Sequence, residues 1–280
     1  MSKYNKIILG TASFEPNYGF KKIKISKKKI FEILRFAKKK KLIIDTSRLY
    51  GSSLYYLKNL KFSGKRVISK FSKNINICKP EDIEKEFLID INILNTKKIL
   101  GYLIHNSNIF FLKNADKYYE NLINLKKKKI IDNIGVSVYS IFEAKKILKK
   151  FKLDIIQIPI NAMNLNSKMF NFLKLAKKKK VKIHARSIFL QGTLVANIKK
   201  NKYIKNYNLK LEKILKKKKI NKVNYLFNLI NSQKLIDKIV IGVENLDQLK
   251  ELIYLKRSKF ENFLINKNIK NNHIDPRNWN

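Results

Sequence analysis

The stretch Leu42-Ile43-Ile44-Asp45, followed five residues later by Tyr50-Gly51, shows the pattern that decides the fold of this chain. A short apolar run rich in β-branched residues is typical of a buried strand, and this one ends on a carboxylate. The pattern recurs at Val67-Ile68-Ser69 before Lys70, at Leu103-Ile104 before His105, and at Ile134-Gly135-Val136 before Ser137. In a parallel barrel, residues at the carboxyl ends of strands meet at one rim, where barrel active sites lie. We therefore expect these polar side chains to share one site.

Strand-like and helix-like runs alternate along nearly the whole chain. The predicted strands are Lys6 to Thr11, Leu42 to Asp45, Arg66 to Lys70, Ile99 to Ile104, Ile130 to Val136, Ile155 to Pro159, Val181 to Ala185 and Lys238 to Gly242. Helical spacing is found at about 27–39, 53–60, from 80 onward, and at about 115–127, 141–150, 167–178, 222–231 and 246–255. Because parallel strands need a crossover each time, this order predicts an α/β fold, a (β/α)8 TIM barrel with residues 1–280 as a single domain.

Two segments do not fit a simple strand–helix unit. The interval Ile188 to Lys234 is longer than one unit requires, and we expect an active-site loop before its helix. The tail, about residues 256–280, is polar with one large aromatic residue, Trp279. Folding of this tail over the barrel mouth and fraying are equally compatible with its sequence.

Composition limits the class of protein. The chain is 45% hydrophobic, enough for a large core, and its single cysteine, Cys78, excludes an internal disulfide framework and fits a reducing compartment. The start of the chain has no secretory apolar region, and no apolar run approaches the ~20 residues that span a bilayer. We expect a cytoplasmic protein with no membrane partner.

The charge is strongly basic, with 63 Lys and Arg against 20 Asp and Glu. A nucleic acid or another polyanion is one partner that such a charge can indicate. The main lysine runs, however, mostly close helical patterns, where cations complement the helix dipole. They would then form a ring on the rim opposite the strand carboxyl ends. Lys, Asn and Ile are abundant together, which favours a chain-wide compositional bias, so nucleic acid binding is the less favoured interpretation.

Each candidate site residue also has a simpler structural explanation. Lysine is so frequent that Lys70 alone carries little information, and Asp45 and Tyr50 alone fit a cap and a half-buried aromatic. A lone histidine such as His105 is more often a packed, hydrogen-bonded residue. What argues against these explanations is that all four residues follow the correct ends of successive strands.

The four residue types together suit carbonyl reduction. A phenol titrates near ~10, and an adjacent ammonium favours its ionised form, while a carboxylate keeps the ammonium charged and oriented. A histidine can polarise a carbonyl group and stabilise the developing alkoxide. No side chain supplies hydride, so the reaction requires a cofactor.

Over nearly its full length the chain resembles the aldo-keto reductase superfamily. The matching segments are Leu9 to Ala12, Asp45 to Gly51, Ser69-Lys70, Ile104 to Asn106, Gly135 to Ser137, Ile156 to Asn161, Arg186 to Gly192, and Ile241 to Val243 followed by Gln248-Leu249. The resemblance implies an NAD(P)H-dependent aldo/keto reductase in which Tyr50 is the general acid. It implies that Asp45 and Lys70 tune Tyr50 and that His105 orients the substrate.

The resemblance also implies a binding site for the nicotinamide cofactor. Ser137 and Gln157 would hold the carboxamide, and the segment from Arg186 to Gly192 would straddle the pyrophosphate. The full set of implied cofactor-binding residues is Gly10, Thr11, Asp45, Ser137, Gln157, Arg186, Ser187, Phe189, Gln191, Gly242, Val243 and Gln248. No metal site is expected, because one cysteine and scattered histidines give no ligand spacing.

Three positions depart from the family pattern. Val138 stands where many members have an asparagine, and Arg186 where many have a tyrosine that stacks on the nicotinamide; a guanidinium can stack as well. The basic residues common near a cofactor 2′-phosphate are not evident after Ile241, and Glu244 would favour a free ribose hydroxyl. Family habit and nearby lysines favour NADP(H), with NAD(H) as the alternative.

The sequence leaves alternatives for the activity, the substrate and the role of His184. The main alternative to a reductase is a cofactor-binding regulatory protein with weak or vestigial catalysis on the same fold. The substrate would be a small carbonyl compound, with a resemblance to sugar-related reductases in the segment from Arg186 to Gly192. Its specificity would lie in the loops Glu15 to Ile25, Asn106 to Phe111 and Thr193 to Leu209. For His184, a core hydrogen-bonding role is favoured over a functional one.

Overall fold

Parallel strands close into a barrel in which each strand pairs with the next and β8 returns to β1. The computed structural model describes residues 6–16, 18–19, 23–196, 202–256, 258–264 and 274–275. The strands are β1 (Ile7–Gly10), β2 (Ile43–Asp45), β3 (Val67–Phe71), β4 (Ile99–Ile104), β5 (Ile131–Ser137), β6 (Ile155–Pro159), β7 (Lys182–Arg186) and β8 (Lys238–Ile241). The predicted (β/α)8 fold is confirmed.

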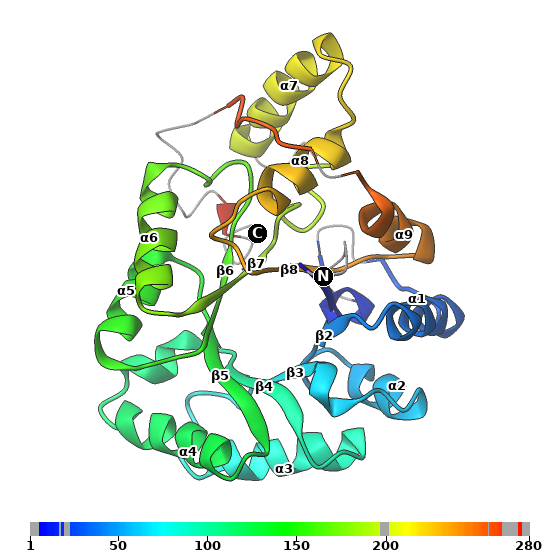
Figure 1. The fold of residues 1–280 in the computed structure, drawn as a ribbon. Helices are drawn as coiled ribbons and strands as arrows, with labels where there is room; N and C mark the ends of the chain where they lie inside the picture. The colour runs from blue at the N-terminus through cyan, green and yellow to red at the C-terminus, as the bar shows by residue number, and fades with distance from the viewer. Residues whose placement is uncertain are drawn as a thin grey trace.

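Helices cover the outside of this barrel (Figure 1). They are α1 (Lys27–Lys39), α2 (Ser53–Asn59), α3 (Asp82–Leu94), α4 (Ala115–Lys127), α5 (Ile141–Lys150), α6 (Ser167–Lys178), α7 (Lys202–Lys217), α8 (Lys222–Asn231) and α9 (Leu246–Tyr254). In α1 the side chains of Ile30, Ile33, Leu34 and Ala37 are buried, as helical spacing predicts. The Ser26 side chain caps α1 by accepting a hydrogen bond from the Lys29 backbone N–H.

Alternate strand residues face the barrel interior. Ile8, Ile68, Leu103 and Ile155 form a buried cluster from four different strands. On β3 this places Ile68 and Lys70 inward, so Ser69 between them faces the helix layer. Gly135 on β5 has no room for a side chain, because a Cβ there would collide with the Ile155 carbonyl oxygen.

The interval after β7 differs from the sequence prediction. It contains a further helix, α7, as well as the expected α8. Ile204, Tyr207, Leu211 and Leu215 form the buried face of α7. This spacing of three and four residues was the signal for a helix, which the surrounding lysines and asparagines made hard to recognise. The active-site loop in this interval is therefore shorter than predicted.

Part of the tail packs against the barrel. Phe263 stacks on Tyr225 of α8 with ring centroids 5.0 Å apart. The Asn262 side-chain amide donates hydrogen bonds to the carbonyl oxygens of Ala162 and Leu165, at 2.9 and 3.2 Å. Residues 258–264 thus attach to α8 and to the segment after β6. Trp279 lies outside the described residues, so its predicted place is untested.

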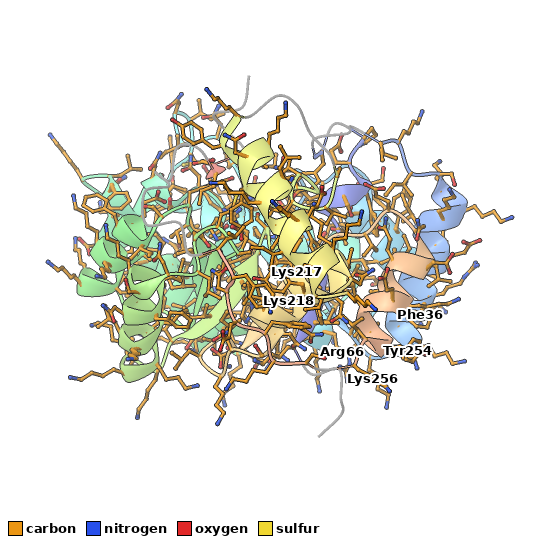
Figure 2. The ribbon with its side chains drawn as sticks, turned by 90° about the horizontal axis from the view of Figure 1, so that it is seen from above. Phe36, Arg66, Lys217, Lys218, Tyr254 and Lys256 are labelled. Carbon is orange, nitrogen blue, oxygen red and sulfur yellow. The ribbon has the colours of Figure 1, made fainter. Side chains whose placement is uncertain are left out.

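The lysine runs close helices, as predicted. The last turns of α1, α4, α6 and α7 each contain two lysines. The residue just beyond several helices is also a lysine with positive φ, where glycine is the usual choice: Lys41, Lys61, Lys129, Lys180 and Lys219. Nitrogen-tipped side chains point outward all around the view in Figure 2, in which Phe36 and Tyr254 mark the contact between α1 and α9. This distribution agrees with a chain-wide bias.

None of the helices among the described residues is both long and apolar enough to cross a bilayer.

Candidate active site

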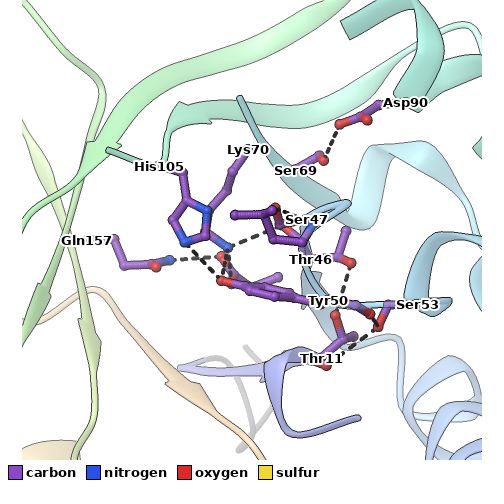
Figure 3. A network of polar contacts seen from close by, with 12 residues as sticks. Thr11, Thr46, Ser47, Tyr50, Ser53, Ser69, Lys70, Asp90, His105 and Gln157 are labelled. Atoms are coloured by element: carbon purple, nitrogen blue, oxygen red, sulfur yellow. Dashed lines mark hydrogen bonds and ion pairs between the residues drawn. The ribbon is translucent and has the colours of Figure 1, made fainter. Parts of the chain in front are cut away.

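A buried ion pair lies at the carboxyl end of β2. Lys70 Nζ is 2.5 Å from Asp45 Oδ1 and also donates to the Thr46 carbonyl oxygen at 3.2 Å (Figure 3). Lys70 is 1% exposed and Asp45 3%, so both charges are held away from water. Burial lowers the pKa of Lys70, and the charge of Asp45 opposes that effect.

The turn after β2 brings Tyr50 back over this ion pair. The Tyr50 backbone N–H donates to the Ser47 carbonyl oxygen at 3.0 Å, and Ser53 Oγ donates to the Tyr50 carbonyl oxygen at 2.6 Å. Gly51 has φ of 55°, which a glycine adopts without strain. The Tyr50 hydroxyl lies 3.4 Å from Lys70 Nζ and 3.3 Å from His105 Nε2. The four side chains expected to share one site are thus brought together.

The direction of the Tyr50 pKa differs from the sequence expectation. Burial raises the pKa of the Tyr50 phenol well above its ordinary value, and the negative charge of Asp45 raises it further. The positive charge of Arg186 lowers the pKa, but burial outweighs this effect because removing a phenolate from water is costly. Tyr50 therefore keeps its proton throughout the neutral range.

His105 follows β4 and meets Tyr50 edge-on, with ring centroids 5.7 Å apart. Burial, with the charges of Lys70 and Arg186, lowers the pKa of His105 to about 3. The imidazole is therefore neutral near pH 7. Its Nδ1 is buried and has no hydrogen-bond partner among the described residues.

A cavity of about 300 Å³ opens beside Tyr50 and extends toward α9. Most of the predicted cofactor-binding residues line it: Gly10, Asp45, Gln157, Arg186, Ser187, Phe189, Gln191, Gly242, Val243 and Gln248. Thr11 and Ser137 are not among its lining residues. Thr11 instead donates to the Thr46 hydroxyl at 2.9 Å, and Ser137 is buried beside Gln157 in the β5–β6 register.

Arg186 has a fixed place at the Tyr50 end of this cavity. Its guanidinium lies 4.3 Å from the centroid of the Tyr139 ring and donates to the Val138 carbonyl oxygen at 3.0 Å. This contact uses the backbone of Val138, so it does not depend on the side chain that departs from the family pattern. The guanidinium can offer a flat surface to an aromatic ligand.

The loop after β7 fits an anionic ligand such as a diphosphate. Ser187, Leu190, Gln191 and Gly192 have positive φ. The backbone N–H groups of Phe189 and Gln191 donate to no other described residue, and both residues line the cavity. Unpaired N–H groups in a tight loop are suited to phosphate oxygens.

Sequence reasoning missed several cavity residues. Tyr18, Ser13 and Glu251 line the cavity, and none was singled out as a site residue. Burial of the Tyr18 hydroxyl is the largest cause, and the nearby Tyr50 the second, of a rise in the pKa of Tyr18 to about 12. The residue as a whole is nevertheless 40% exposed. Tyr18 lies in the predicted specificity loop Glu15 to Ile25, so an aromatic in a loop at the mouth was the available signal.

The other two specificity loops behave differently. Residues Val195 and Ala196 of the Thr193 to Leu209 segment line the cavity, whereas none from Asn106 to Phe111 does so. His184 is buried on β7, and its Nδ1 has no hydrogen-bond partner within the described part of the chain. In that part no group of three His, Cys, Asp or Glu side chains is placed to hold a metal ion.

Comparison with known proteins shows the family and the fold of the chain. The family model described as "Aldo/keto reductase family" matches residues 6–261. The fold resembles an aldo-keto reductase from Bacillus halodurans in its holo form, with a TM-score of 0.75 and 16% identity over 96% of this chain and 90% of that chain. It also resembles a glycerol dehydrogenase from Gluconobacter oxydans, with a TM-score of 0.68 and 17% identity over 91% and 87% of the two chains. No curated protein sequence matches.

Proposed function

The chain belongs to the aldo/keto reductase family of oxidoreductases, and on that basis we propose that it reduces an aldehyde or ketone to an alcohol with hydride from a nicotinamide dinucleotide. One observation carries the proposal. The Tyr50 hydroxyl contacts both Lys70 Nζ and His105 Nε2 at the end of a cavity that is long enough to reach α9.

Tyr50 is the proton donor. Its raised pKa means that the proton is present at neutral pH and is transferred only when negative charge develops on the carbonyl oxygen. The ammonium of Lys70, held by Asp45, stabilises the phenolate that remains. His105 is neutral and, with its proton on Nε2, donates a hydrogen bond to the same oxygen. The carbonyl group thus gains one hydride at carbon and one proton at oxygen.

The cavity residues would hold the dinucleotide along its length. Gln157 would bind the carboxamide, and the Ser187 to Gln191 loop would bind the diphosphate. Ser137, buried beside Gln157 and outside the lining, would reach the carboxamide only through a local rearrangement. Gly242, Val243 and Gln248 would lie at the adenosine end. The bound dinucleotide supplies the hydride, which no side chain can supply.

The charges that line the cavity favour NAD(H) over the NADP(H) expected from the sequence. The described lining residues include two carboxylates at the α9 end, Glu244 and Glu251, and no lysine or arginine there. A carboxylate accepts hydrogen bonds from a free ribose diol and repels a 2′-phosphate. Arg186, the cation of the lining, lies at the opposite end.

The mouth of the cavity favours a hydroxylated carbonyl substrate. Tyr18 and Arg186 place a phenol and a guanidinium next to Tyr50, and both can bind hydroxyl groups. The structural similarity to a glycerol dehydrogenase is in line with a small polyol-related substrate.

Replacement of Tyr50 tests the reaction. Tyr50→Phe should leave the Kd for the dinucleotide within about twofold and lower turnover by about 10²-fold or more. Tyr55→Phe, which removes an exposed hydroxyl from α2, is the control and should have normal turnover. Unchanged turnover in Tyr50→Phe would remove Tyr50 from the mechanism. Dinucleotide binding by the unmodified protein without turnover of any carbonyl compound would favour the regulatory alternative.

Replacement of Glu244 tests the cofactor preference. The unmodified protein should bind NADH about tenfold more tightly than NADPH, measured by fluorescence titration. Glu244→Lys should reduce or reverse that ratio, because it places a cation beside the 2′ position. Asp247→Lys makes the same charge change on α9 at a fully solvated side chain, and its ratio should stay within about twofold of the original. Tighter binding of NADPH by the unmodified protein would contradict the preference.

A further inference from the structure

A buried carboxylate lies behind the site, on the helix side of the barrel wall. Asp90, in the middle of α3, is fully buried and does not line the cavity. Ser69 Oγ donates a hydrogen bond to Asp90 Oδ2 at 2.5 Å, as Figure 3 shows. Arg48 Nε lies 2.9 Å from Asp90 Oδ1 and forms an ion pair with it, without the geometry of a hydrogen bond. One carboxylate therefore contacts two different segments of the chain.

Both of these segments carry a site residue. Ser69 immediately precedes Lys70 on β3, and the alternation of the strand turns Ser69 toward α3 and Lys70 toward the barrel interior. Arg48 lies in the turn after β2, two residues before Tyr50. Asp90 thus joins these two backbone segments from outside, while the Tyr50 hydroxyl and Lys70 Nζ meet 3.4 Å apart on the inside.

Arg48 is held by a second carboxylate on the same helix. Glu86 lies one helical turn before Asp90, and its carboxylate pairs with the Arg48 guanidinium. Arg48 therefore forms ion pairs with α3 at two successive helical turns. Asp90 differs from Glu86 because it alone also binds Ser69.

Burying the Asp90 carboxylate costs desolvation free energy. Burial raises the pKa of Asp90 to about 6, and the buried hydroxyl of Tyr102 nearby has no hydrogen-bond partner among the described residues. An apolar side chain on this face of α3 would avoid the desolvation cost. A buried carboxylate here has a reason only if its hydrogen bond to Ser69 and its ion pair with Arg48 matter.

We propose that Asp90 is a positioning residue, which fixes the turn that carries Tyr50 relative to the strand that carries Lys70. Its effect on the rate rests on the proposed function, whereas its effect on the Tyr50–Lys70 contact does not.

Replacement of Asp90 by asparagine keeps the shape and removes the charge. Asp90→Asn should lower kcat by about tenfold or more, with KM and the Kd for the dinucleotide within about twofold. In the Tyr50→Phe background it should lower the residual rate no further, because it acts through Tyr50. Asp82→Asn is the matched control on α3: Asp82 pairs with Lys73 at 2.9 Å, so its loss should lower the Tm without lowering kcat.

A second measurement does not require turnover. In protein with ¹³Cζ-labelled tyrosine, the Tyr50 resonance, assigned with Tyr50→Phe, should shift in Asp90→Asn and stay unchanged in Asp82→Asn. Ser69→Ala should shift the same resonance, and Ser69→Thr, which keeps the hydroxyl, should restore it. If Asp90→Asn does not fold, Ser69→Ala and Ser69→Thr test the proposal in its place. An unchanged Tyr50 resonance in the folded variants would overturn the proposal, whereas an absence of turnover in the unmodified protein would count only against the proposed function.

Discussion

The side-chain amide of Gln157 donates a hydrogen bond to Asp45 Oδ2 at 2.8 Å, while the other oxygen of the same carboxylate binds Lys70. Gln157 comes from β6 and Asp45 from β2, so the contact crosses the barrel mouth. All three side chains are nearly inaccessible to water. Asp45 therefore links the residue expected to hold a carboxamide with the residue that supports the proton donor.

This contact predicts how Gln157→Glu will behave. The introduced carboxylate would lie against Asp45, and repulsion between the two would raise the pKa of the introduced carboxyl group in the folded state. When the pKa of a carboxyl group is higher in the folded state than in the unfolded state, the free energy of unfolding decreases as the pH rises above the unfolded-state pKa, near ~4.3. The free energy of unfolding should therefore fall more steeply between about pH 5 and pH 8 in the variant than in the original protein. Urea denaturation of both proteins at about pH 5 and pH 8 measures the change in the free energy of unfolding with pH. An equal change in the variant and the original protein would contradict the contact between Gln157 and Asp45.

Removal of Lys70 should damage both stability and activity. Lys70→Met leaves Asp45 as a buried charge without its cation, and breaking such a pair costs about 3–5 kcal/mol. The double variant Asp45→Asn, Lys70→Met should recover most of that stability and none of the activity, because the ammonium beside Tyr50 is still missing. Urea unfolding and carbonyl turnover measured on the same samples separate the two effects. A double variant as unstable as Lys70→Met would show that the ion pair is not the cause.

The fold was largely readable from the sequence because the strand runs are short, apolar and separated by helical spacing. Strand alternation and the order of the strands were sufficient to place Asp45, Tyr50, Lys70 and His105 at one mouth. Helix α7 was not predicted, since its apolar residues stand among many lysines and asparagines.

Other features depend on tertiary structure that no local pattern contains. The direction of the Tyr50 pKa is set by burial in the assembled mouth, so residue types alone indicated the opposite sign. Tyr18 reaches the site from a loop, and Asp90 acts through partners 21 and 42 positions away along the chain. Such partners become visible only when α3 packs against β3.

His184 should make the protein sensitive to acid. Burial, with the positive charges of Lys238 and Lys182, lowers its pKa to about 3. Because the unfolded state binds a proton near ~6.5, stability is fully present above that pH and falls as the pH drops toward the folded value, by about 1.4 kcal/mol per pH unit for one proton. His184→Gln should remove that part of the slope in urea unfolding measured from about pH 5 to pH 6.5. An unchanged slope would show that His184 is not buried as a neutral group.

Lysines with positive φ predict where the protein can be made more stable. Lys129 follows α4 with φ of 59°, and its backbone N–H donates to the Lys126 carbonyl oxygen at 2.9 Å. A side chain is strained in this left-handed conformation and glycine is not, so Lys129→Gly should raise the free energy of unfolding by about 0.5–1 kcal/mol. Glu120→Gly, at an exposed position in the middle of α4, should lower it by about 1 kcal/mol, because there glycine loses helical propensity. Urea unfolding of the two variants measures the difference, and destabilisation by both would show that position 129 does not hold the left-handed conformation. Lys41, Lys61, Lys180 and Lys219 follow other helices in the same conformation, so the gains from glycine at these positions should add.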